Sequence, residues 1–174
     1  MTRWMTRTAC ATLLALSANA AFAQESTNIV GKATDWSIFT EADPKECWGV
    51  SPPKETLNTR DGQPVSVRRG DILLFVTFRP GNGAGEVSFT GGYPFAPGST
   101  VSVVIDGQTY EMFTDGEWAW AASPADDATL LTALKKGSTA VVTGRSSKGT
   151  QTQDTFSLRG FTAAMEEAAK RCLS

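Results

Sequence analysis

The stretch DILLFVTF, residues 71–78, is the most apolar run of this 174-residue chain outside its N-terminal region. Successive side chains of a β-strand point to opposite faces of a sheet. Both faces of this run are apolar: one carries Ile72, Leu74, Val76 and Phe78, and the other carries Leu73 and Phe75. A strand that is apolar on both faces needs cover on both, so we expect residues 71–78 to form a central strand in the interior of the fold.

Short strand-like segments flank this run on both sides. Gly, Pro, Asn and Asp interrupt them at intervals that are typical of sandwiches and barrels. The Asp106-Gly107 pair is a two-residue turn signal between two such segments and predicts a hairpin. The sequence therefore predicts an all-β fold, an antiparallel β-sandwich. Besides the central run, the predicted strands are residues 36–39, 47–50, 65–67, 86–90, 101–105, 109–113, 140–143 and 155–158.

Two short helices at the periphery of the sandwich complete the predicted fold. The first covers Pro124–Lys136, with Ser123 as its cap and Pro at its first position. Asp126 and Asp127 lie in its first turn, where acids face the positive end of the helix dipole. Adjacent helical residues point about 100° apart, so we assign these acids to the dipole rather than to a catalytic carboxylate pair. Alanines and a Glu-before-Lys spacing predict a second helix over residues 161–171.

The first 23 residues have the order of regions found in secretory signal peptides. A basic segment with Arg3 and Arg7 is followed by an apolar run and by the small-x-small site Ala21-Phe22-Ala23. We expect cleavage after this site, which leaves residues 24–174 as a single domain in the periplasm or outside the cell. No other segment approaches the roughly 20 apolar residues of a membrane span.

The cysteines point to one structural disulfide. Of the three in the chain, Cys10 lies in the predicted signal peptide, which leaves Cys47 and Cys172. Exported proteins mature in oxidising compartments, so we expect these two cysteines to be bonded. Their separation differs from the CxxC spacing of redox-active pairs, which favours a structural role.

The composition argues against several function classes. The chain contains no His, which removes the commonest general base and the Ser-His-Asp, Cys-His and His-dependent zinc sites. Its formal net charge of −2 offers no particular attraction to nucleic acid or to a membrane surface. The glycine-rich segment at residues 79–85 lacks the GK[ST] ending of a phosphate loop. We therefore expect no enzyme, no cofactor and no metal.

Two tryptophans are the candidate ligand-binding residues. Alternation in the sequence Glu117-Trp118-Ala119-Trp120 puts both indoles on one face of a strand. Displayed together, they would form an aromatic platform for the apolar face of a sugar. Large aromatic residues are more often buried than displayed, which favours a place in the core for both. Solvent accessibility of Trp118 and Trp120 distinguishes the two interpretations.

Several short strings of the sequence match a known pattern, namely residues 45–48, 69–72, 91–95, 98–99, 105–106, 113–114, 134–137 and 156–164. Together they resemble the invasion-associated locus B family of exported bacterial proteins. The resemblance extends from about Ile29 to Cys172, and its most specific piece is the SLxGFTAA string that begins at Ser157. Longer family members carry a further close pair of cysteines, whereas residues 114–122 contain none here, which marks a short variant with one disulfide.

The resemblance implies a secreted or periplasmic β-sandwich with no known catalytic residues. The name of the family derives from a role in host-cell entry in its pathogenic members. We expect a non-catalytic envelope or periplasmic interaction protein with an envelope or host-surface partner. A carbohydrate or cell-wall binding module is the alternative, supported by the two tryptophans. A hydrolase with paired carboxylates is disfavoured, because the chain lacks His and no two acids share one predicted surface.

Overall fold

A computed structural model describes residues 28–81 and 84–173. The predicted signal peptide, its cleavage site before Gln24 and Cys10 lie outside the described residues. Within them, twelve strands and two helices occur. They are β1 (Ile29–Ala33), β2 (Trp36–Ala42), β3 (Lys45–Ser51), β4 (Glu55–Arg60), β5 (Gln63–Pro64), β6 (Leu73–Phe78), β7 (Glu86–Thr90), β8 (Thr100–Ile105), β9 (Gln108–Asp115), β10 (Trp118–Ala121), α1 (Pro124–Lys136), β11 (Thr139–Arg145), β12 (Gln151–Ser157) and α2 (Phe161–Leu173).

The strands form one antiparallel sheet in the order β1-β2-β3-β6-β7-β10-β9-β8-β11-β12-β4-β5. The sheet bends over so that its two halves face each other. Phe89 of β7 packs edge-on against Phe156 of β12 with ring centroids 6.1 Å apart, although four strands separate β7 and β12 in the order. From the first half, Trp36 donates its indole N–H to the carbonyl of Ser157 in β12 at 3.0 Å. The predicted all-β, antiparallel sandwich is confirmed.

Strand β6 lies in the middle of its half of the sheet, between β3 and β7, as predicted. Leu74 and Val76 on its inner face are buried in the core. On its outer face, Leu73 and Phe75 are only half-buried. The prediction of full cover on both faces is therefore wrong for the outer face, over which no second layer formed by residues 28–81 or 84–173 lies. The predicted strand at residues 65–67 is also wrong: these residues follow the two-residue strand β5 in irregular structure.

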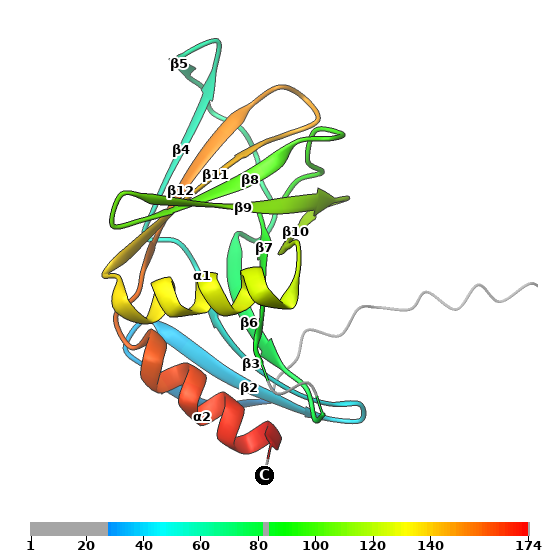
Figure 1. The fold of residues 1–174 in the computed structure, drawn as a ribbon. Helices are drawn as coiled ribbons and strands as arrows, with labels where there is room; N and C mark the ends of the chain where they lie inside the picture. Colours follow the sequence, from blue (N-terminus) through cyan, green and yellow to red (C-terminus); the bar gives the residue numbers. More distant parts are fainter. Residues whose placement is uncertain (1–27, 82–83, 174) are drawn as a thin grey trace, which may run out of the picture.

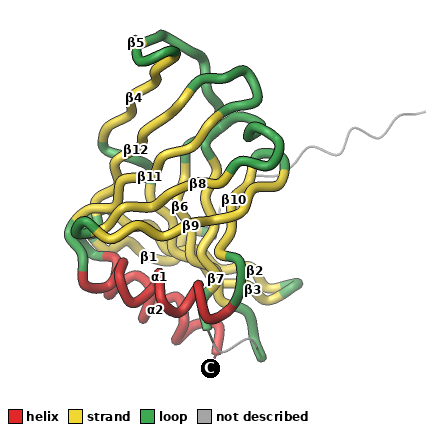
Figure 2. Tube along the Cα trace, turned by 45° about the horizontal axis from the view of Figure 1, so that its top comes forward, coloured by secondary structure: helices red, strands yellow, loops and turns green. Residues whose placement is uncertain are grey.

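Both predicted helices are present, and both lie at the same end of the strands, opposite the β4–β5 and β11–β12 turns (Figures 1 and 2). Helix α1 has the predicted bounds, and the Ser123 hydroxyl accepts a hydrogen bond from the N–H of Asp126 at 3.2 Å. Helix α2 packs against β1, β2, β3 and β6. Its buried side chains include Met165 and Cys172, so it covers that part of the inner face.

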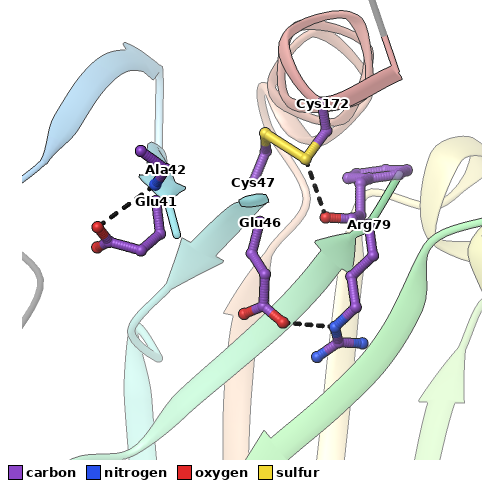
Figure 3. The surroundings of a disulfide bond; sticks show 7 residues. Glu41, Ala42, Glu46, Cys47, Arg79 and Cys172 are labelled. Atoms are coloured by element: carbon purple, nitrogen blue, oxygen red, sulfur yellow. Dashed lines mark hydrogen bonds and ion pairs between the residues drawn. A yellow bond between two sulfur atoms is a disulfide. The ribbon is translucent and has the colours of Figure 1, made fainter. Parts of the chain in front are cut away.

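The disulfide is confirmed. Cys47 in β3 and Cys172 in the last turn of α2 are bonded, with Cα atoms 5.5 Å apart (Figure 3). Both cysteines are buried, and the Cys172 Sγ lies 3.1 Å from the carbonyl oxygen of Phe78 in β6. The bond therefore fixes the end of α2 to β3, which lies beside β6, and the outer face of these two strands carries part of the candidate site.

Candidate functional site

A strip of aromatic side chains lies across the outer face of the sheet from β2 to β9. Trp118 lies at its centre, with its ring centroid 5.6 Å from that of Phe75 and 6.3 Å from that of Trp120. At one end, Phe113 lies 5.5 Å from Trp120, and at the other Phe39 stacks on Trp48 at 5.6 Å with an interplanar angle of 5°. The six rings come from β2, β3, β6, β9 and β10.

A groove of about 340 Å³ opens in this strip, and we call it the aromatic groove. Its aromatic walls are Trp48, Phe75, Trp118 and Trp120. Cavities of about 300–1,000 Å³ are the usual size of small-molecule sites. The other residues that line it are Glu46, Thr77, Arg79, Glu86 and Ser88.

Sheet register explains why a hollow forms between the rings. Ser88 of β7 pairs with Phe75 on one side and with Trp120 on the other, so a small side chain lies between two large ones in a row across three strands. Thr77 pairs with Trp48 in the same way in the next row. Among the described residues, the Ser88 and Thr77 hydroxyls have no hydrogen-bond partner. The floor of the groove therefore offers two hydroxyls that are free to bond a ligand.

The indole N–H groups add donors to the walls. Trp36, in the core, donates its N–H to a backbone carbonyl, whereas no protein acceptor within the described ranges meets the N–H of Trp48, Trp118 or Trp120. A tryptophan displays an apolar ring and a polar N–H together, which suits a ligand that has both kinds of surface.

An ion-paired cluster closes one end of the aromatic groove. The Arg79 guanidinium donates from Nε to Glu46 at 2.5 Å, and its Nη1 lies 3.3 Å from a carboxylate oxygen of Glu86 (Figure 3 shows the first contact). The hydrogen bond to Glu46 raises the pKa of Arg79 above its usual value. Glu46 directly precedes Cys47, and Arg79 directly follows Phe78, so the disulfide lies immediately beneath this rim.

The structure corrects the expectation that the two predicted tryptophans belong to the core. Trp118 is 39% exposed and Trp120 is half-buried, and neither joins the buried cluster. The small residues between and after them, Ala119 and Ala121, face inward instead. The bulky side chains of β10 thus point away from the core, the opposite of what burial preference predicts.

Most of the aromatic groove was not predicted from the sequence. The sequence predicts a buried face for Phe75 and a strand that contains Trp48, with no role for either side chain in a site. The available signal was the alternation within β3, where Trp48 lies between the inward-facing Cys47 and Gly49.

The two acids of helix α1 have separate roles. Asp126 is exposed in the first turn, where its carboxylate accepts a hydrogen bond from the Ser123 hydroxyl at 2.6 Å. Asp127 is buried and accepts the backbone N–H of Val87 in β7 at 2.8 Å. Burial raises the pKa of Asp127, and the hydrogen bond from Val87 opposes that rise. The dipole assignment therefore accounts for Asp126, whereas Asp127 also fixes α1 to the sheet.

Comparison with known proteins bears on the identity of the chain. A family model described as invasion associated locus B (IalB) protein matches residues 36–169, which is most of the chain. The protein belongs to the IalB family. Neither curated proteins nor solved structures gave a significant match. All six aromatic residues of the strip lie within the part that matches the IalB family.

Two further findings concern the described ranges, 28–81 and 84–173. No helix there has the length and apolar character needed to cross a membrane. No three or more Asp, Glu or Cys side chains in these ranges gather into a group that could hold a metal ion.

Proposed function

We propose that this IalB-family protein is an exported, non-catalytic binding protein of the bacterial envelope whose aromatic groove binds carbohydrate, with cell-wall glycan as the ligand class. The observation that carries the proposal is the display of Trp118 and Trp120 at the surface beside Phe75 and Trp48. Export rests on the signal-peptide pattern of residues 1–23.

Carbohydrate suits the chemistry of the aromatic groove. A pyranose ring presents a C–H face that is apolar and an edge of hydroxyl groups. Burying the C–H face against an indole removes apolar surface from water. The hydroxyl edge then meets the Ser88 and Thr77 hydroxyls, and the Glu46, Arg79 and Glu86 side chains at the rim supply charge-assisted hydrogen bonds.

A protein partner is the second candidate, because aromatic residues are enriched at protein interfaces. The shape of the site favours the sugar. Thr77 and Ser88 make a shallow, open depression between the rings, and a depression about the size of a small-molecule site suits one or two sugar rings.

The absence of catalysis is part of the proposal and is supported by the ion pairs that the acidic side chains of the groove make. Glu46 and Glu86 both pair with Arg79 at the rim. Both carboxylates are partly exposed and held in ion pairs, which supports a role in hydrogen bonding a ligand rather than in catalysis.

Isothermal titration calorimetry tests this proposal. Residues 24–174 are titrated with soluble peptidoglycan fragments and with a set of neutral oligosaccharides, together with Trp118→Ala and Trp120→Ala. Leu57→Ala is the matched control, because Leu57 is an exposed apolar residue on β4, outside the groove. We expect binding by the unmodified protein and by the control, and at least tenfold weaker binding by each tryptophan variant. Absence of binding to every glycan, or equal binding by all variants, would overturn the proposal.

A further inference from the structure

A second hollow, of about 410 Å³, lies between the β11–β12 turn, the end of β4 and the segment that leads into β6. We call it the basic pocket, because four of the residues that line it are cations and only one is an acid. The cations are Arg60, Arg68, Arg69 and Lys148, and the acid is Glu117.

One of the four cations is neutralised inside the protein. Arg69 donates two hydrogen bonds to the buried carboxylate of Asp154, at 2.7 and 2.6 Å. It also donates to the carbonyl of Gly91 at 2.8 Å, and its guanidinium lies 5.1 Å from the ring centroid of Tyr93. The Arg69 side chain is therefore a fixed part of the pocket wall with its charge already balanced.

The other three cations have no carboxylate partner among the described residues. Arg60 donates to the Thr150 hydroxyl at 2.8 Å, and Arg68 and Lys148 are exposed and make no hydrogen bond to the described part of the chain. Against the single carboxylate of Glu117, these three leave the pocket with a net charge of +2. The whole chain has a formal net charge of −2, so the charge of the pocket is opposite in sign to that of the protein as a whole.

Hydrogen bonds of the backbone and of two side chains hold the segments around the pocket in place. The N–H of Ser147 donates to the carbonyl of Pro94 at 2.9 Å, and the Tyr93 hydroxyl lies 2.6 Å from the Thr152 hydroxyl. The N–H of Gly70 donates to the carbonyl of Gly92 at 2.9 Å. A Cβ at position 92 would lie 2.6 Å from the backbone of Gly70, so only glycine allows this approach. The backbone that carries the free cations is thus preorganised.

We propose that the basic pocket binds the phosphate group of a phosphate monoester. Such a group carries a charge of about −1.5 to −2 near neutral pH, which balances the +2 of the pocket, and its three terminal oxygens are strong hydrogen-bond acceptors. Guanidinium groups match it with paired donors, and a lysine adds a mobile point charge. The Thr150 hydroxyl, held by Arg60, lines the same pocket as a further hydrogen-bonding group.

The test is a calorimetric titration at constant ionic strength with inorganic phosphate, glucose 6-phosphate and acetate as probes. The variant Arg68→Ala/Lys148→Ala is compared with Lys135→Ala/Lys170→Ala, which removes the same charge from exposed positions on the two helices. We expect each phosphate to bind the unmodified protein and Lys135→Ala/Lys170→Ala, the helix variant, with equal affinity. Its affinity for Arg68→Ala/Lys148→Ala, the pocket variant, should be lower by about tenfold or more. Glu117→Gln removes the opposing charge and is expected to tighten binding several-fold.

Three results would overturn the phosphate assignment. The first is equal loss of affinity in the pocket and helix variants, which would indicate attraction to general surface charge. The second is binding of acetate as tight as that of phosphate, and the third is no binding of either phosphate. Trp120→Ala is expected to leave phosphate affinity unchanged, so the outcome is separate from that of the glycan titration.

Discussion

Trp118 and Trp120 lie side by side on the outer face of β10, with ring centroids 6.3 Å apart and ring planes 24° from parallel. Their neighbours Ala119 and Ala121 fill the inward positions. On β10, two alanine methyl groups therefore face the core and two indoles face the solvent. Such an arrangement costs apolar burial, which is consistent with a surface kept for a ligand.

The exposed and buried tryptophans are expected to respond differently to truncation. Trp36 is fully buried, packs edge-on against Phe161 with centroids 4.9 Å apart and donates a hydrogen bond, so Trp36→Ala should lower the free energy of unfolding by about 3–5 kcal/mol. Trp120→Ala removes a half-buried ring and should cost only about 1–2 kcal/mol. Urea denaturation of both variants measures the difference. Equal losses would show that Trp120 is a core residue in solution.

Loss of the disulfide is expected to weaken the fold. Cys172→Ser frees the end of α2 from β3 and removes a cross-link between residues 125 positions apart, which should cost about 2–5 kcal/mol in urea denaturation. Cys47→Ser should have the same effect, because either change breaks the same bond. Unchanged stability of either variant relative to the oxidised protein would contradict this role.

Asp127 is expected to make stability depend on pH. Because burial raises its folded-state pKa above that of the unfolded chain, the ionised carboxylate disfavours the folded state at pH values above the folded-state pKa. That cost disappears as the pH falls through this pKa. As the pH falls from 7 to 4, the free energy of unfolding of the unmodified protein should therefore rise relative to that of Asp127→Asn. In Asn the side-chain oxygen still accepts the N–H of Val87.

The control for this measurement is Asp126→Asn, at the exposed neighbouring position. It should change the free energy of unfolding at pH 7 by only about 0.3–1 kcal/mol. A stability difference between Asp127→Asn and the unmodified protein that stays constant from pH 7 to pH 4 would contradict the prediction.

For the buried pair of Arg69 and Asp154, removal of one charge is expected to cost more stability than removal of both. Burial raises the pKa of Asp154, and its hydrogen bonds with Arg69 oppose that rise. Asp154→Ala leaves the Arg69 charge buried without a partner, which should cost about 3–5 kcal/mol. The double variant Arg69→Met/Asp154→Leu removes both charges and should be more stable than Asp154→Ala. A double variant that is less stable than Asp154→Ala would contradict this expectation and would show that the ion pair itself stabilises the fold.

Local signals predicted the parts of the fold that depend on local sequence. The bounds of α1 follow from Ser123, Pro124 and Gly137, which act within one turn of the helix. The hairpin around Asp106 forms as predicted, because Asp106 and Gly107 both adopt the positive φ that its turn requires. The disulfide followed from the two cysteines outside the predicted signal peptide together with the predicted export to an oxidising compartment.

Two features that depend on long-range pairing were not predicted, namely the Arg69–Asp154 ion pair and the aromatic groove. Arg69 and Asp154 are 85 positions apart, and no local pattern relates them. The aromatic groove depends on the sheet order, which places β10 beside β7 and β3 beside β6. Trp118 and Trp120 were recognised as candidates, but their exposure depends on whether another layer covers β10, and the sequence carries no sign of that.

The most direct test of the aromatic groove follows the indole N–H signals in ¹H–¹⁵N NMR spectra of residues 24–174 during titration with the peptidoglycan fragment that binds in calorimetry. These residues contain four tryptophans: Trp48, Trp118 and Trp120 line the groove, and Trp36 is buried with its N–H bonded to the Ser157 carbonyl. The account predicts that the three groove signals shift together and saturate while the Trp36 signal stays in place. A saturable titration in which none of the three moves, or in which Trp36 moves as much as they do, would contradict it.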